Sequence, residues 1–175
     1  MMIFGGMATM KTIVLLLLLF SCSNLAAQDL SNVLLYEQRF FDSDTCCWRK
    51  LANTKEYEKA GNMIVSYLKK NKNRTNSQSL QWHAGQMFAK AQNDKQAIFY
   101  FKKTYNFLYR LFGSDEGKAW YFYAKGTVAF IKRDKEKLQK MIQKWDKNLP
   151  KDRNYDALVQ LYENWDKKYL EATEP

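Results

Sequence analysis

The residues with the most distinctive chemistry are the adjacent cysteines Cys46 and Cys47. Adjacent thiols can form a ring disulfide, an intermolecular bridge or part of a soft-metal site. The simplest interpretation is one buried and one exposed thiol on a short helix. No CxxC or Cys–His spacing typical of zinc sites accompanies them. The single histidine, His83, has no evident nucleophile or carboxylate partner, and we expect it to pack on a helix. The sequence therefore predicts no metal site and no cofactor.

Motifs of the common enzyme classes are missing from this sequence. It contains no GxSxG, no HExxH, no phosphate-binding loop and no dinucleotide fingerprint. Acids such as Glu56, Glu58 and Glu136 lie among lysines, which is typical of a solvated helix face. A glycosidase needs two carboxylates held across a cleft, and no pattern here pairs two acids in that way. We expect a non-catalytic protein, and an enzyme with an unrecognised site on a helical scaffold is the alternative.

The first 27 residues have the pattern of an export leader. Lys11 precedes an apolar run that ends at Phe20, and small residues lead to an exit at Ala27. A basic start, a short apolar core and a small-residue exit are typical of a signal peptide. Alternatively, Cys22 ends the lipobox-like sequence LFSC and would be lipidated. The style of the leader resembles those of Bacteroidetes. Either exit predicts an exported protein, in the periplasm or at the outer membrane, with 28–175 as a single domain.

Basic residues outnumber acidic residues in this chain. The 175 residues include 28 Lys and Arg against 18 Asp and Glu, a net charge of +10. Loss of the leader would remove only Lys11, leaving 27 basic and 18 acidic residues and a charge of +9. No apolar stretch after the leader is long enough to cross a bilayer.

The most basic segment is 132–151, where lysines recur at helical spacing and form a candidate basic face. Its members are Lys137, Lys140, Lys144 and Lys147. Such a face, with Trp145 nearby, can bind an acidic partner or an anionic surface weakly, or it can simply be solvated. Because an exported protein rarely meets nucleic acid, we expect no nucleic-acid partner.

The elements that would position these residues centre on 82–107. Apolar and small residues recur there at threes and fours, on one face of each of two helices: Trp82, Gly85 and Phe88, then Ala97, Ile98 and Phe101. Asp94, between the two sets, is a good N-cap. The second helix is expected to continue to Phe112. Three consecutive aromatic residues at 99–101 make it apolar on more than one side, so neighbours should sandwich it.

Weaker copies of this hairpin lie on either side. Trp48 precedes Gly85 by 37 residues, and Asp134 follows Asp94 by 40 residues. Thr54 and Ser114 are candidate helix caps within the flanking copies. An opening helix over 30–41 and a closing helix capped by Asn154 complete an all-α fold of about seven helices.

This arrangement resembles a tetratricopeptide repeat, a helical hairpin of about 34 residues. Gly85, Phe88, Ala97 and Phe101 fall at the matching offsets, whereas Trp82 lies one place off and the closing proline is absent. The resemblance covers 45–148. It implies a right-handed stack of three antiparallel hairpins with flanking N- and C-terminal helices.

The same resemblance implies a class of function. The family binds peptides and proteins in a concave groove lined by the first helices, and it shares no catalytic residues. The candidate groove residues on this chain are Trp82, Gln86, Tyr123 and Lys125. We therefore expect a non-catalytic interaction module of the cell envelope with a protein or peptide partner. An envelope lipoprotein with a structural or anionic-surface-binding role is the alternative.

Overall fold

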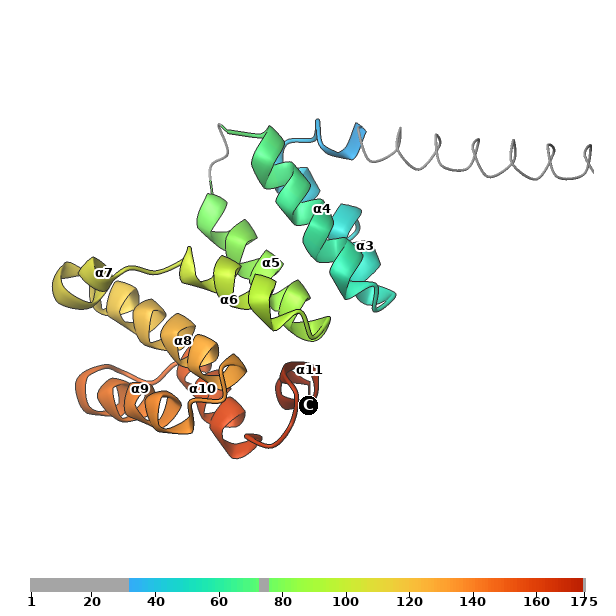
Figure 1. Cartoon of the computed structure of the whole chain (residues 1–175). Helices are drawn as coiled ribbons and strands as arrows, with labels where there is room; N and C mark the ends of the chain where they lie inside the picture. Colours follow the sequence, from blue (N-terminus) through green and yellow to red (C-terminus); the bar gives the residue numbers. More distant parts are fainter. Residues whose placement is uncertain (1–31, 73–75, 175) are drawn as a thin grey trace, which may run out of the picture. The chain divides into compact units, whose positions relative to one another are not determined.

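A computed structural model describes residues 32–72 and 76–174 (Figure 1). The chain divides after Glu37 into two units, and every helix labelled in Figure 1 lies in the second. In the first unit, Asn32 and Val33 are helical, and the Leu35 N–H donates to the Asn32 carbonyl at 2.9 Å. The opening helix expected over 30–41 is therefore not continuous, because the described residues leave helical geometry before Gln38.

The second unit is all-α, which confirms the predicted fold class. Within the described residues it has ten helices, three more than expected: α2 (Gln38–Phe41), α3 (Cys47–Asn53), α4 (Tyr57–Lys70), α5 (Ser77–Lys90), α6 (Asp94–Lys102), α7 (Phe107–Phe112), α8 (Asp115–Ile131), α9 (Lys135–Asn148), α10 (Arg153–Glu163) and α11 (Tyr169–Thr173). None of the helices in the described part of the chain is both long and apolar enough to cross a membrane.

Three pairs of consecutive helices, α3/α4, α5/α6 and α8/α9, are joined by the same type of turn (Figure 1). One residue in each turn has left-handed backbone geometry, with φ of 63° at Lys55, 61° at Gln92 and 58° at Arg133. The N–H of the next residue donates to the carbonyl five residues earlier, at 2.8, 2.8 and 2.9 Å respectively. This is the Schellman arrangement, which satisfies the last carbonyls of the first helix. The three hairpins thus share one turn geometry.

The turns fix the spacing of the copies. Lys55 and Gln92 are 37 residues apart, which equals the predicted spacing of the first two copies. Gln92 and Arg133 are 41 residues apart, one more than the spacing predicted between the second and third copies. The prediction took Asp94 as the cap of α6. The cap is Asn93, whose Oδ1 accepts from the Gln96 N–H at 3.3 Å. Asn and Asp cap equally well, so two adjacent candidates left the choice open by one position.

Two other caps also differ from expectation. Thr54 ends α3 rather than beginning α4, and its hydroxyl donates to the Leu51 carbonyl at 3.1 Å. At α10 the cap is Asp152, whose Oδ1 accepts from the Asn154 and Tyr155 N–H groups at 2.8 and 3.0 Å. Ser114 and Asp134 do cap α8 and α9. Each difference is a competition between neighbouring polar residues.

Two glycines lie where one helix packs closely against another. A Cβ added at Gly85 would lie 2.5 Å from the ring of Phe101, and one added at Gly126 would lie 2.6 Å from Leu158. Phe101 is fully buried, and its ring centroid lies 4.5 Å from that of Trp82. The absence of a side chain at Gly85 therefore lets α5 and α6 approach around one aromatic anchor.

The segment after α6 departs from the expected long helix. Helix α6 ends at Lys102, and the carbonyl of Thr104 accepts from Gln78 Nε2 at 2.9 Å and from Trp120 Nε1 at 2.8 Å. Asn106 then caps the separate helix α7 through the Tyr109 N–H at 3.1 Å. A backbone carbonyl that serves two side chains from α5 and α8 cannot also serve a helix ladder, so the helix stops here.

The C-terminal helices cover the third hairpin and return to the second. Helix α10 contacts α8 and α9, and α11 contacts α5. The ring of Tyr169 on α11 is buried, with its centroid 6.2 Å from that of Phe101 and 6.4 Å from that of Phe130. The segment between α10 and α11 is held by Arg133, which donates to the Trp165 and Lys167 carbonyls.

Candidate functional site

The first helices of the second and third hairpins line a groove together with α10. Its central cavity, of about 490 Å³, is lined by Trp82 and Gln86 of α5, Trp120 and Tyr123 of α8, and Arg153 of α10. The ring centroid of Trp82 lies 4.9 Å from that of Trp120 and 5.0 Å from that of Tyr123. Three of the four candidate groove residues, separated by as many as 41 positions, therefore meet in one place.

The aromatic residues form the floor of this groove rather than its rim. Trp82 is only 6% exposed. The indole N–H of Trp120 is already engaged by the Thr104 carbonyl. Burial raises the pKa of Tyr123 to about 12, so its hydroxyl stays protonated near neutral pH. The floor therefore offers flat apolar surface and a neutral hydroxyl.

Gln86 lines three neighbouring cavities. Besides the central one, it lines a cavity of about 220 Å³ with Tyr169 and Thr173, and one of about 350 Å³ with Trp48 and Lys90. Residues of α3, α5, α8, α10 and α11 line these cavities. We call these three cavities together the groove.

Amides are the commonest polar side chains around the central cavity. Asn76, Gln78, Gln86 and Asn154 contribute amide side chains, and no carboxylate is among the residues that line this cavity. Arg153 supplies the one guanidinium, and no described carboxylate lies within ion-pair distance of it. The Asp152 side chain next to it caps α10 instead. The cavity therefore favours a polar ligand that carries one negatively charged group.

Lys125, the fourth candidate, does not line the groove. It lines a separate cavity of about 440 Å³. Lys125 follows Tyr123 by two positions, which places it about 200° around the helix. The two candidates therefore lie on nearly opposite sides of α8, and only Tyr123 lines the groove.

The cavity that contains Lys125 brings together cations from three helices, and we call it the basic cleft. Its cationic members are Arg110 of α7, Lys125 of α8, and Lys137, Lys140 and Lys144 of α9. Three lysines of the predicted basic face are among them, whereas Lys147 is exposed elsewhere. The acids that line the cleft are Asp134, whose Oδ2 is 3.9 Å from Lys137 Nζ, and Glu136. Sequence periodicity found the α9 lysines, but it could not place Arg110 and Lys125 beside them.

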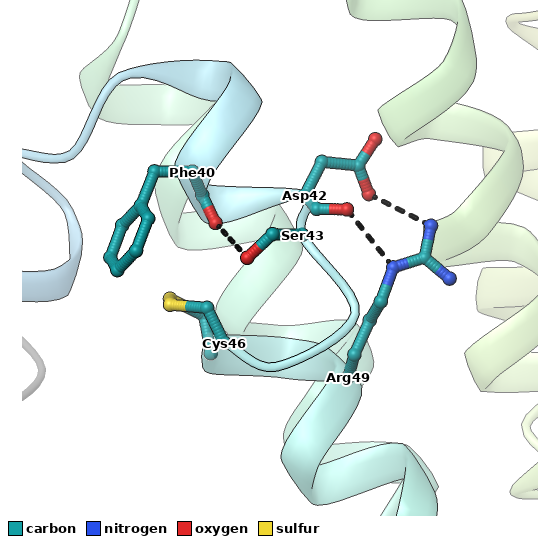
Figure 2. The surroundings of a disulfide bond; sticks show 6 residues. Phe40, Asp42, Ser43, Cys46 and Arg49 are labelled. Atoms are coloured by element: carbon teal, nitrogen blue, oxygen red, sulfur yellow. Dashed lines mark hydrogen bonds and ion pairs between the residues drawn. A yellow bond between two sulfur atoms is a disulfide. The ribbon is translucent and has the colours of Figure 1, made fainter.

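The vicinal cysteines form a disulfide, Cys46–Cys47 (Figure 2). Both are 8% exposed, so the expectation of one buried and one exposed thiol was wrong. Cys47 has φ of 57° at the start of α3. Figure 2 shows Arg49 reaching back from α3, where Nε donates to the Asp42 carbonyl at 3.1 Å and Nη2 to its carboxylate at 3.3 Å. The disulfide thus lies in the segment from Asp42 to Arg49, and the Arg49 side chain holds the two ends of that segment together.

No group of three or more His, Cys, Asp or Glu residues within the described ranges could hold a metal ion. His83 lies at the boundary between two of the groove cavities. Its ring centroid is 5.0 Å from that of Trp48, and its Nδ1 is 3.0 Å from Gln86 Oε1. Burial lowers the pKa of His83, and the hydrogen bond to Gln86 offsets part of that effect. The imidazole faces an amide rather than a nucleophile or a carboxylate.

No known protein family, no curated protein and no solved structure matches this chain. The predicted export leader, including the candidate lipidation site Cys22, lies outside the described residues.

Proposed function

We propose that this chain is a non-catalytic, tetratricopeptide-like module that binds an extended peptide segment of another protein in the groove. The observation that carries the proposal is the convergence of Trp82, Gln86 and Tyr123, from first helices of successive hairpins, in one cavity. That is the surface on which such hairpins bind their partners in the family that the sequence resembles. Nδ1 of His83, the one imidazole at the groove, faces the Gln86 amide rather than a nucleophile, which also favours binding over catalysis.

The groove chemistry specifies the kind of peptide. An amide side chain presents both a donor and an acceptor, so Gln86 and Asn154 can pair with an extended peptide backbone. The tryptophan and tyrosine floor suits an apolar side chain. Arg153, unpaired and beside the cavity, suits a carboxylate, because a guanidinium binds that group with two parallel hydrogen bonds. The proposed ligand is an extended peptide with an apolar residue close to an acidic one.

The setting proposed for this activity is the periplasm or the outer-membrane surface. The basis is the leader sequence, in which Lys11, the apolar run and the exit at Ala27 form an export signal. A lipid on Cys22 would tether the same module to a membrane. In either case the partner is another envelope protein.

The test is selection of peptides from a random display library by the purified protein. We expect the selected peptides to pair an apolar residue with Asp or Glu and to lose affinity when Arg153 is replaced by Glu. Lys95→Glu is the matched charge reversal, because Lys95 is exposed on α6 and does not line the groove. It should bind the same peptides as the parent.

Gln86→Ala should weaken the same peptides without altering the fold, because Gln86 is only part-buried. Peptides that bind the parent, Arg153→Glu and Gln86→Ala equally well would show that the groove is not the binding site. A library from which no peptide is enriched would contradict peptide binding itself.

A further inference from the structure

Helix α7 presents an apolar surface that the rest of the described chain does not cover. Its sequence is FLYRLF, and none of its six residues is buried. Phe112 is 82% exposed, Leu108 59%, Phe107 53% and Leu111 47%. Sequence periodicity had placed these residues in a packed extension of the central hairpin. The break after α6 moves them onto the surface instead.

The size of this surface distinguishes it from the scattered exposed side chains of any soluble protein. With about 150–250 Å² per large side chain, the exposed fractions amount to roughly 500 Å² of apolar area. Contiguous patches of more than a few hundred Å² mark contacts with other proteins or with membranes. The apolar residues belong to a single helix that ends at an exposed phenylalanine, so the patch projects from the surface and is not a pocket.

The chemistry beside α7 identifies what would cover it. Arg110, in the middle of α7, also lines the basic cleft. The cleft has five cations and two acids, and one of those acids is 3.9 Å from Lys137. An apolar projection is therefore bordered by a concentrated positive charge, and Arg110 belongs to both.

We propose that α7 and the basic cleft form a docking surface for an anionic lipid bilayer. Phe112, Leu108 and their neighbours enter the boundary between headgroups and acyl chains, while the cleft cations bind the lipid phosphates. Apolar side chains combined with flanking Lys and Arg are the pattern of interfacial membrane binding. The surface does not depend on the proposed peptide binding, because no residue of α7 or the cleft lines the groove.

A second copy of this chain fits the surface less well than a bilayer. A stable dimer buries about 800 Å² on each partner, which is more than α7 offers. A symmetric contact through α7 would also bring two basic clefts toward each other, and like charges in close apposition disfavour association. Charge complementarity therefore favours an anionic surface.

The experiment is flotation of the protein, as purified from producing cells, with vesicles of phosphatidylcholine alone or with phosphatidylglycerol added. We expect binding to the mixed vesicles that weakens as salt rises, because exposed charges are screened over about 10 Å at 0.1 M. The double variant Leu108→Gln/Phe112→Gln and the triple variant Lys137→Gln/Lys140→Gln/Lys144→Gln should each lose about tenfold or more in partition.

Each variant has a matched control outside the surface. Phe99→Gln removes an aromatic residue that is 50% exposed on α6. Lys95→Gln/Lys102→Gln/Lys147→Gln removes three exposed lysines that do not line the cleft. Both controls should float like the parent. Circular dichroism should be the same for all the proteins, since every substituted position is exposed or part-buried.

A Phe112→Trp variant tests insertion directly. Its emission should shift to shorter wavelength on the mixed vesicles, and bromine atoms on the acyl chains should quench it more than they quench the parent. Flotation that is equal for the parent and both test variants would overturn the proposal, since binding would then come from another part of the chain. So would equal binding to neutral vesicles, or self-association lost in Leu108→Gln/Phe112→Gln without any vesicle binding.

Discussion

At the scale of single residues, the Cys46–Cys47 disulfide differs from most disulfides in what it can do for stability. A disulfide stabilises largely by closing a loop of the unfolded chain, and a bond between neighbours closes almost none. Its effect is therefore local, on the loop that Arg49 holds to Asp42 (Figure 2). The rest of the core depends on side-chain packing and not on this bond.

The disulfide gives a direct mass-spectrometric prediction. Trypsin cuts after Arg39 and Arg49, so a single peptide carries both Cys46 and Cys47. When the protein is alkylated without prior reduction, this peptide should remain unlabelled and be lighter than its dithiol form by two hydrogen atoms. Reduction first should give two labels. A peptide that takes up label without reduction would mean that the two thiols are free.

His83 makes a prediction about stability and pH. Burial lowers its pKa in the folded state below the value of about 6.5 that it has when unfolded. The unfolded chain therefore binds more protons at low pH. The contribution of a neutral His83 to stability is present above pH 6.5 or so and is lost as pH falls toward the folded pKa.

Urea unfolding at about pH 7.5 and pH 5 measures this effect. The parent should lose more stability across that interval than His83→Gln, which cannot titrate and retains an amide beside Gln86. Groups shared by both proteins cancel in the comparison. Identical losses in the parent and the variant would mean that His83 is not the group responsible.

At the scale of elements, the close crossing of α5 and α6 depends on Gly85. Alanine at this position would gain about 0.5–1 kcal/mol of helix propensity. Its Cβ would lie 2.5 Å from the ring of Phe101, which is fully buried and cannot move aside freely. Overpacking costs about 1–3 kcal/mol, so Gly85→Ala should be destabilised by about 1–2 kcal/mol in chemical unfolding.

Gly117→Ala is the control for this substitution, because an added Cβ would meet Ser114 Oγ at 3.9 Å, which is an ordinary van der Waals contact. It should be neutral or slightly stabilised. Adding Phe101→Leu to Gly85→Ala should recover part of the loss, although Phe101→Ala alone should cost about 3–5 kcal/mol. A Gly85→Ala protein more stable than the parent would contradict the close packing of α5 against α6 at this position.

The turn shared by the three hairpins gives a second prediction at this scale. Lys55 holds a left-handed backbone, which L-residues adopt at a cost of about 1–2 kcal/mol and glycine adopts freely. Lys55→Gly should therefore stabilise the protein. We expect a gain of up to about 1 kcal/mol, because the greater conformational freedom of glycine in the unfolded chain offsets part of the relieved backbone strain. Lys50→Gly, within α3, should instead destabilise it by roughly the same amount. A melting temperature higher for Lys50→Gly than for Lys55→Gly would contradict a left-handed backbone at Lys55.

The sequence predicted elements better than it predicted contacts between them. The first two hairpins followed from apolar spacing, because a helix buries one face and that face is local information. The bounds of the second did not, since it was expected to continue to Phe112 and α6 ends at Lys102. The break after α6 could not be predicted, because it depends on Gln78 and Trp120 meeting the Thr104 carbonyl from helices that are distant in sequence. Arg110 and Lys125 joined the α9 lysines for the same reason.

At the scale of the whole molecule, the proposed function depends on export, which the leader predicts. Protein recovered from the envelope should lack Met1–Ala27 or begin at a lipid-modified Cys22, since the apolar run around residues 13–20 is typical of a cleaved signal. Intact-mass spectrometry distinguishes the two forms. A mature protein that still carries an unmodified residue 10–27 segment would contradict export by this route.

The return of α11 to α5 limits how this molecule can change over evolutionary time. Repeat arrays commonly lengthen by duplication of a unit, which then stacks on an exposed terminal face. Here α10 covers α8 and α9, Tyr169 lies near aromatic residues of two hairpins, and Lys168 Nζ donates to Gln92 Oε1 at 2.6 Å. A hairpin duplicated after α9 would have to displace all of these contacts at once. The packing of α10 and α11 therefore opposes the addition of a hairpin after α9.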